Sequence, residues 1–274
     1  MKDLDTQDIE IQVLLEAIYL RYGYDFREYA RALVKRRILR RLSLSGLKTL
    51  AEMQHRVLYD ATFFDTLLKD LSIPVTEMFR DPSFYKALRE QVIPMLKTYP
   101  LLNIWHAGCS TGEEVYSLAI LLQEEGLYER AQIYATDFNN DVLQKAKDGI
   151  YPIENVKEYT CNYQKAGGKT SFVNYYTAKH DHIIMKRALK SRVVFANHNL
   201  ASDTVFHEMN MIVCRNVFIY FTKCLQNRIL RLFSESLGHY GFLCLGAKEH
   251  LKFLDDAHHF EPVVEDEKIF RKTC

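Results

Sequence analysis

Residues 107–114, with the sequence AGCSTGEE, combine two glycines with two adjacent carboxylates. An apolar run at 101–105 precedes them and an amphipathic run at 115–122 follows, an order typical of a strand, a turn and a helix. Glycines four residues apart let the backbone bend sharply and pass close to a ligand. Free N–H groups at the start of the helix would favour a negative ligand group. The segment therefore predicts a ligand-binding turn.

A further carboxylate, Asp137, ends the next apolar run, where it could accept hydrogen bonds from both hydroxyls of a ribose. The turn does not match G-x-G-x-x-G, because Ser110 takes the middle position, and it lacks the Lys-Ser/Thr pair of a P-loop. These departures disfavour a pyrophosphate cradle and favour a nucleoside cofactor without phosphate, S-adenosylmethionine. Glu113 and Glu114 would meet its ammonium group, or else stabilise the first helical turn through the helix dipole.

A second motif, CRNVFIYF at 214–221, begins at the end of an apolar strand. Open α/β sheets bind ligands at the carboxyl ends of their strands, and Arg215 and Asn216 follow this strand where packing residues would be expected. Asn216 can donate and accept hydrogen bonds toward a cofactor. Tyr220 could reach the reacting group, although an isolated tyrosine is more often a buried aromatic residue.

A third motif, VTEMFRDP at 75–82, lies where a helical segment meets the alternating part of the chain. Clefts between domains are common places for a site. Arg80 could fix a carboxylate there, or it could pair with Asp81 at a helix end.

Six cations lie within eleven residues, with no acidic residue between them. They are Arg31, Lys35, Arg36, Arg37, Arg40 and Arg41. On a helix, residues four apart share a face. Most charge runs are solvated faces, but in a chain of net charge +1 this cluster favours docking of an anionic partner.

The composition is that of a soluble globular protein: 274 residues, 48% hydrophobic and 26% charged, enough for one or two domains. No apolar run reaches about 18 residues, which argues against a membrane span. The acidic start of the chain is unlike a secretory signal. Six cysteines without a C-x-x-C pair indicate reduced thiols, no metal site and a cytoplasmic location.

The first 75 residues are predicted to be helical, because apolar residues such as Ile11, Leu14 and Ile18 recur at helical spacing. From residue 102, short strands alternate with helices, as in a mostly parallel sheet with helices on both faces. We expect strands at 102–106, 132–136, 193–196, 209–213 and 242–245, helices at 113–124, 140–147 and 225–236, and an antiparallel edge strand at 268–271.

Two segments interrupt this alternation. Residues 81–96 are expected to form a linker helix. Residues 149–191 are too long for a simple crossover, and runs at 172–176 and 182–185 around a polar turn predict an inserted β-hairpin. The expected domains are a helical domain at 1–75, a linker helix at 76–100 and an α/β, Rossmann-like cofactor domain at 101–274, with the insert at 149–191.

The chain resembles the chemoreceptor glutamate methyltransferases of the CheR family over nearly its whole length. The motifs that carry the resemblance are VTEMFRDPSFY (75–85), AGCSTGEEVYSLA (107–119), YATDFNNDVLQKAKDGIY (134–151), FANHNL (195–200) and CRNVFIYF (214–221). Their order and joint presence are highly specific. The resemblance implies transfer of a methyl group from S-adenosylmethionine to a receptor glutamate, which gives a glutamyl methyl ester and S-adenosylhomocysteine.

The same resemblance assigns roles to individual residues. Arg80 and Tyr220 would lie nearest the substrate carboxylate as catalytic residues. Glu114 would hold the methionine end of the cofactor, and Asp137 its ribose or adenosine part. The whole cofactor site would comprise Thr76, Arg80, Ala107, Gly108, Glu114, Asp137, Phe138, Asn199, Leu200, Asn216 and Val217. The basic run at 31–41 would dock on the acidic, helical methylation region of the receptor.

The chain departs from the family pattern at several positions. Pro74 stands where the family often has Asn, Met78 replaces a Phe, and Val115 replaces a Pro. The loop at 176–182 is short and lacks glycine, which favours recognition of receptors without a C-terminal pentapeptide. We expect a monomer that neither binds nucleic acid nor inserts into a membrane.

Two other functions stay open from the sequence. A methyltransferase of another substrate class could use the same fold, but a DNA amino-methyltransferase would carry Asn/Asp-Pro-Pro-Tyr/Phe after the fourth strand, where this chain has Cys-Arg-Asn-Val. A cofactor-binding signalling module without turnover would not need Arg80, Asp137, Asn216 and Tyr220 together.

Overall fold

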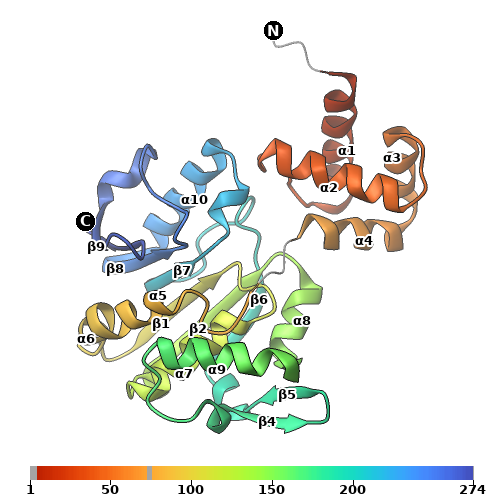
Figure 1. Cartoon of the computed structure of the whole chain (residues 1–274). Coiled ribbons are helices and arrows are strands. Elements are labelled where there is room, and N and C mark those ends of the chain that lie inside the picture. The colour runs from red at the N-terminus through yellow and green to blue at the C-terminus, as the bar shows by residue number, and fades with distance from the viewer. Residues whose placement is uncertain (1–4, 73–75, 274) are drawn as a thin grey trace. The chain divides into compact units, whose positions relative to one another are not determined.

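The computed structural model describes residues 5–72 and 76–273 and divides the chain into two compact units (Figure 1). The first comprises Met1–Ile73 and Ile219–Arg228, and the second comprises Pro74–Phe218 and Ile229–Cys274. The domain boundaries at residues 75 and 100 stay predictions, and the structure adds a segment from far along the chain to the helical unit. None of the described helices is long and apolar enough to span a membrane.

The first unit is a group of helices, as predicted. Its helices are α1 (Thr6–Tyr22), α2 (Arg31–Leu44), α3 (Leu50–Tyr59) and α4 (Ala61–Leu71). Gly23 ends α1 in a left-handed conformation, and the Thr49 side chain accepts a hydrogen bond from the Glu52 N–H at the start of α3. Leu14 and Ile18 of α1 are fully buried, so the apolar spacing seen in the sequence does form the core of this unit.

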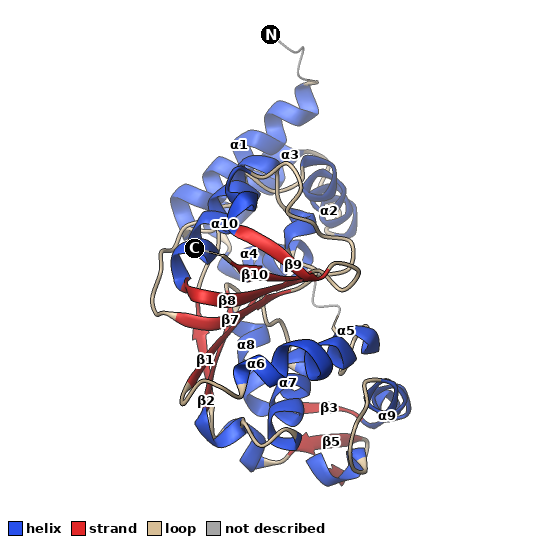
Figure 2. Ribbon diagram, turned by 90° about the vertical axis from the view of Figure 1, so that its left-hand side faces the viewer, coloured by secondary structure: helices blue, strands red, loops and turns tan. Residues whose placement is uncertain are grey.

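A seven-stranded sheet forms the centre of the second unit (Figure 2). Its order is β6-β2-β1-β7-β8-β10-β9. The strands are β1 (Leu102–Ala107), β2 (Ala131–Asp137), β6 (Val193–Asn197), β7 (Met209–Cys214), β8 (Leu237–Leu245), β9 (Phe260–Val264) and β10 (Ile269–Lys272). The first five in this order pair in parallel, which confirms the predicted strands and the mostly parallel sheet.

The predicted edge position of the last strand is wrong. β10 is antiparallel but pairs with β8 on one side and with β9 on the other, so β9 is the edge. The sequence does not predict β9, because Glu261 and Pro262 interrupt its strand pattern. Proline is tolerated on an edge strand, where no neighbour needs its missing N–H.

Helices cover both faces of this sheet, as expected. The main ones are α7 (Glu113–Glu124), α8 (Asn140–Asp148) and α10 (Lys223–Ser236), which confirm the three predicted helices. Side chains of β1 alternate between the faces: Trp105 packs on Phe233 of α10, whereas His106 lies 3.8 Å from Glu114 of α7.

The segment before the sheet is helical but not one regular helix. It consists of α5 (Pro82–Ala87), a π-helical turn (Leu88–Val92) and α6 (Ile93–Leu96). The wider turn ends two residues before Pro94, which has no N–H to continue an α-helical ladder.

The insert is larger than the predicted hairpin. It contains a three-stranded antiparallel sheet of order β3-β5-β4, made of β3 (Ile150–Pro152), β4 (Tyr176–Lys179) and β5 (His182–Met185), and the unpredicted helix α9 (Val156–Lys165). The hairpin is confirmed at β4 and β5, but the first strand starts at Tyr176, because Phe172–Tyr175 forms a 3-10 turn. The loop expected at 176–182 therefore shortens to His180 and Asp181. Within the described part of the whole chain, the other 3-10 turns are Tyr128–Arg130, Ile153–Asn155, Arg187–Lys190, Phe218–Tyr220 and Asp255–His259.

Candidate functional site

The glycine-rich turn after β1 folds over the carboxyl end of β2. The N–H groups of Gly108 and Cys109 both donate to the Thr136 carbonyl at 2.8 Å. One residue on, the Ser110 N–H donates to Oδ2 of Asp137 at 3.0 Å. The turn and the carboxylate that the sequence analysis placed at one site therefore contact each other directly.

Most N–H groups of the turn itself bond within the protein, and the expectation of free N–H groups at the start of the helix stays a prediction. The N–H groups of Gly108, Cys109 and Ser110 are bonded to β2, and the Gly112 N–H donates to the Cys109 carbonyl at 3.0 Å. These backbone hydrogen bonds hold the turn in shape, so the N–H groups of Gly108, Cys109, Ser110 and Gly112 are not available to a ligand.

Both glycines of the turn are required by close packing and by backbone conformation. Gly108 has φ 75° and Gly112 has φ 92°, values that favour glycine. A Cβ on Gly108 would lie 2.7 Å from Cγ2 of Val217, and one on Gly112 would lie 2.8 Å from the Cβ of Ala146. Gly108 thus brings the end of β1 against the turn that follows β7.

The Asp137 carboxylate has hydrogen-bond acceptor positions left for a ligand. Its Oδ2 accepts from Ser110 N–H, and its Oδ1 accepts from Asn139 N–H at 3.0 Å. Burial raises the pKa of this carboxyl, and backbone N–H groups, including that of Phe138, oppose the rise. A carboxylate offers about four acceptor positions, so two hydroxyl groups could still be accommodated.

The Glu113 side chain is buried at the first turn of α7, where its Oε2 accepts from Oγ1 of Thr111 at 2.7 Å. Burial raises the pKa of Glu113 from 4.5 to about 7. Between these values the folded chain keeps a proton that the unfolded chain releases, so the contribution of Glu113 to stability falls as the pH rises through this window.

We therefore expect Glu113→Gln, which keeps an acceptor for Thr111 but cannot ionise, to raise the unfolding temperature at pH 8 by roughly 5 °C. The gain should shrink toward pH 5, where Glu113 is protonated in the folded wild type. Differential scanning calorimetry of both proteins at several pH values measures the effect. A difference that does not change with pH would contradict the assigned titration.

Glu114 and Arg215 form a buried ion pair. The Arg215 guanidinium also donates to the Arg80 carbonyl at 3.2 Å and to Oδ2 of Asp81 at 2.6 Å. Burial raises the pKa of Glu114, and the charge of Arg215 opposes that rise. The sequence alone gives Arg215 no role. Its only signal was a charged residue directly after an apolar strand.

The turn after β7 is held by Glu249, which the sequence analysis missed. Its Oε2 accepts from the N–H groups of Asn216 at 3.0 Å and of Gly246 at 2.6 Å. Asn216 has φ 60°, a conformation that asparagine adopts more readily than most residues. Oδ1 of Asn216 and Oγ of Ser110 are buried without a hydrogen-bond partner among the described residues. Unpartnered polar atoms beside a glycine turn fit a ligand rich in donors and acceptors, such as S-adenosylmethionine.

The end of β6 adds the remaining predicted residues. The His198 N–H donates to the Asp137 carbonyl at 3.2 Å, which joins this segment to β2. Asn199 uses its N–H on Asp203 and its Oδ1 on Ala201, and Leu200 is buried.

The second unit thus carries, at or next to the carboxyl ends of four neighbouring strands, most of the residues predicted to bind the cofactor. They are Ala107, Gly108, Glu114, Asp137, Phe138, Asn199, Leu200, Asn216 and Val217. Thr76 and Arg80 belong to the same unit, and both are half-buried. Tyr220 belongs to the first unit, where its carbonyl accepts from the Ala30 N–H at 2.7 Å, so its catalytic role stays a prediction.

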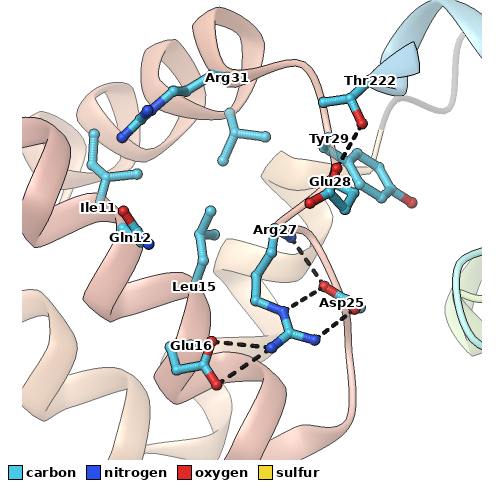
Figure 3. Close-up of a pocket in the computed structure, with 11 residues that line it drawn as sticks. Ile11, Gln12, Leu15, Glu16, Asp25, Arg27, Glu28, Tyr29, Arg31 and Thr222 are labelled. Carbon is cyan, nitrogen blue, oxygen red and sulfur yellow. Dashed lines mark hydrogen bonds and ion pairs between the residues drawn. The ribbon is translucent and has the colours of Figure 1, made fainter. Parts of the chain in front are cut away.

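A cavity within the first unit is lined by α1, by residues 25–31 and by Thr222 (Figure 3). Arg27 donates to Asp25 at 2.9 Å and pairs with Glu16 at 3.1 Å, and Glu28 accepts from Thr222 at 2.8 Å. The Arg27 charge on this wall is already paired with two carboxylates, and we assign no ligand to the cavity.

The six cations of the basic run separate into two sets on α2. Lys35 pairs with Asp8, Arg41 pairs with Asp70, and Arg37 donates to the carbonyls of residues 70 and 72. The exposed set is Arg31, Arg36 and Arg40. Arg31 only reaches the Asp8 carbonyl at 3.5 Å, and no hydrogen bond or ion pair joins Arg36 or Arg40 to another described residue. The surface that remains for an anionic partner is therefore smaller than predicted.

Comparison with known proteins gives matches along both units. Residues 74–269 match the family model "CheR methyltransferase, SAM binding domain", and residues 9–72 match "CheR methyltransferase, all-alpha domain". A Pseudomonas putida protein named "Putative methyltransferase Cher3" is 53% identical, with 97% of each chain covered. Two proteins named "Chemotaxis protein methyltransferase" also match. That of Listeria monocytogenes is 31% identical over 84% of this chain and 85% of its own, and that of Escherichia coli K12 is 29% identical over 92% and 88%.

Proposed function

The chain belongs to the CheR methyltransferase family, and from this premise we propose which of its residues carry out the reaction. The protein transfers a methyl group from S-adenosylmethionine to side-chain carboxylates of glutamates in chemoreceptors, and S-adenosylhomocysteine is the second product. The observation that best supports our assignment of the cofactor site is the contact between the glycine turn and Asp137. It leaves a carboxylate with spare acceptor positions beside a turn whose own two glycines carry no side chain.

We propose that Asp137 accepts the ribose hydroxyls and that Glu114 lies near the methionine end of the cofactor. Oδ1 of Asn216 would accept a hydrogen bond from a polar group of the cofactor, because it has no partner among the described residues. The remaining members of the site would be Thr76, Arg80, Ala107, Gly108, Phe138, Asn199, Leu200 and Val217. When bound, the cofactor supplies an electrophilic methyl group.

The receptor glutamate needs no general base. Its unperturbed pKa of about 4.3 makes it an anion at neutral pH. The protein must therefore orient this carboxylate and exclude water, which is work for hydrogen-bond donors and not for a proton acceptor. We assign the orientation to Arg80 and Tyr220. If these residues bound the receptor carboxylate much more tightly in the ground state than in the transition state, the reaction would be slower.

Receptor docking is assigned to the exposed cations of α2. Arg36 and Arg40 lie one helical turn apart, and their charges are not used within the described fold. A row of cations at this spacing would complement an acidic helix, such as the methylation region of a receptor. We further propose that the protein is a cytoplasmic monomer that does not insert into a membrane. We also propose that it does not require a C-terminal pentapeptide on the receptor, because only two residues connect β4 and β5.

The double variant Arg36→Glu/Arg40→Glu is expected to raise the KM for a receptor fragment about tenfold, because it places like charges against the acidic helix. Cofactor affinity, measured by calorimetry, should not change. Arg187→Glu, at an exposed position of the second unit, is the matched control. If receptor methylation and cofactor affinity fell together, the docking role would be wrong.

Transfer of radiolabelled methyl groups to receptor cytoplasmic fragments, followed by mild alkali, tests the reaction itself. Label released as methanol identifies a carboxyl methyl ester. Alkali-stable label would point to N- or C-methylation, hence to another substrate class. Cofactor binding without transfer to any receptor fragment would instead favour a binding module without turnover.

A further inference from the structure

The turn that carries Arg80 has an unfavourable backbone conformation on both sides of this residue. Phe79 has φ 54° and Asp81 has φ 55°, so two non-glycine residues are left-handed. Such conformations cost energy and persist only where the surrounding structure holds them. They are concentrated at functional sites, which makes the contacts around this turn informative.

Three separate elements hold the turn. The Phe79 N–H donates to Oγ of Ser117 in α7 at 2.8 Å. Nδ2 of Asn162 in α9 donates to the Met78 carbonyl at 3.3 Å. The third contact comes from the residue that follows β7, Arg215, and it is the one that reaches Arg80 itself.

The Arg215 side chain contacts both Glu114 of α7 and the turn that carries Arg80. Its Nη1 contacts the Glu114 carboxylate and the Arg80 carbonyl, the latter at 3.2 Å, and its Nη2 donates to Oδ2 of Asp81 at 2.6 Å. The guanidinium also lies 4.1 Å from the centre of the Phe84 ring, which restricts its plane. A planar guanidinium has donors in fixed directions, so it fixes the positions of its partners relative to one another. A flexible ammonium group does not do this.

We propose that Arg215 is a positioning residue for methyl transfer, holding the strained Arg80 turn at a fixed position relative to Glu114. Arg80 would orient the receptor carboxylate and Glu114 would lie near the methionine end of the cofactor, so Arg215 aligns the two reactants. The inference rests on the proposed function, since it needs those two roles. Pairing with Glu114 alone would already neutralise the buried charge. The additional contact to Asp81, whose side chain is 40% exposed, is not needed for that neutralisation.

Asp81 allows a test that keeps the buried ion pair intact. Glycine adopts a positive φ without strain but removes the acceptor, so Asp81→Gly breaks one of the two contacts that join the turn to Arg215. Asparagine tolerates the same backbone and keeps one oxygen for Arg215, so Asp81→Asn is the matched variant. We expect kcat for a receptor fragment to fall at least about tenfold in Asp81→Gly, because small displacements of reacting groups are costly. In Asp81→Asn it should stay within about threefold of wild type, and in Asp81→Gly the calorimetric Kd for S-adenosylmethionine should change less than kcat does.

A second variant changes Arg215, the other residue of the contact with Asp81. Arg215→Lys keeps a positive charge for Glu114, but its ammonium has no planar fork for Arg80 and Asp81 together. We expect the same direction of change in kcat, and the combination with Asp81→Gly should cost little more than Arg215→Lys alone, because both changes break the contact between Arg215 and Asp81. Lys268→Gly relieves a positive φ of 55° elsewhere in the second unit and should leave kcat unchanged.

The outcomes separate this inference from the proposed function. Wild-type kcat in folded Asp81→Gly and Arg215→Lys would overturn the inference and leave the proposed function intact. Equal losses of kcat and cofactor affinity in Asp81→Gly would also overturn it, because they would indicate general damage to the site. If the wild-type chain methylated no receptor fragment, the proposed function would fail, and the inference with it. Should Arg215→Lys not fold, as circular dichroism would show, the two Asp81 variants decide alone.

Discussion

Arg80→Ala is expected to lower methyl transfer to a receptor fragment at least about 100-fold while the chain keeps its fold. The receptor carboxylate is already an anion, so the enzyme gains rate mainly by alignment, and alanine removes the donors that we assign to this task. Arg80 is half-buried, and its turn is held by backbone contacts with Ser117, Asn162 and Arg215 that the substitution leaves in place. Radiolabel incorporation at saturating cofactor and receptor measures the loss.

Arg187→Ala, which removes an exposed arginine of the same unit, is the control and should behave like wild type. Arg80→Lys is informative as well. It keeps the charge without the two-pronged geometry, and partial activity would show that charge contributes separately from orientation. Turnover of Arg80→Ala at the wild-type rate would remove Arg80 from the site.

Asp137→Ala is expected to weaken S-adenosylmethionine binding about 100-fold. The change removes the proposed acceptor for the ribose hydroxyls. It also leaves the N–H groups of Ser110 and Asn139 without their acceptor, and each such loss costs about 1–3 kcal/mol. Calorimetric titration with the cofactor gives the affinity directly. The thermal midpoint should fall too, because the glycine turn loses one of its hydrogen bonds to β2, that of the Ser110 N–H.

Asp137→Asn separates these two effects. Its single carbonyl oxygen can accept from one of the two N–H groups but no longer offers a full carboxylate, so affinity should lie between wild type and Asp137→Ala. Unchanged affinity in both variants would place the ribose elsewhere.

Local patterns along the chain predicted the elements that are both long and periodic. Residues 113–124 were predicted as a helix, and α7 has those same bounds, because Gly112 supplies the turn before an apolar run of helical period. Strand β9 was missed for the opposite reason, since Glu261 and Pro262 disrupt its pattern and its place depends on pairing with β10. Helix α9 was missed within a segment whose hairpin was the stronger signal.

The residues of the candidate site also divide into those that the sequence predicts and those that only the structure reveals. Glycine spacing and the acid at the end of β2 identified the turn and Asp137 from sequence alone, because each lies directly after its own strand. Nothing local identifies Glu249, which holds Asn216 across 33 residues, or the link from Arg215 to Asp81 across 134. Such partners meet only when parallel strands bring their carboxyl ends to one edge.

Helix α2 shows the difference in a single element. The order of residues determined by itself that six cations lie on a helix and which of them share a face. Only the tertiary structure decided which charges remain for a partner, because Asp8 and Asp70 lie on other helices and pair with Lys35 and Arg41 once the helices pack. Sequence thus determined the family, the strand–turn–helix order and the chemistry of the cofactor site. Packing decided which side chains are held, which are strained and which stay available, since those properties depend on contacts between residues far apart in the chain.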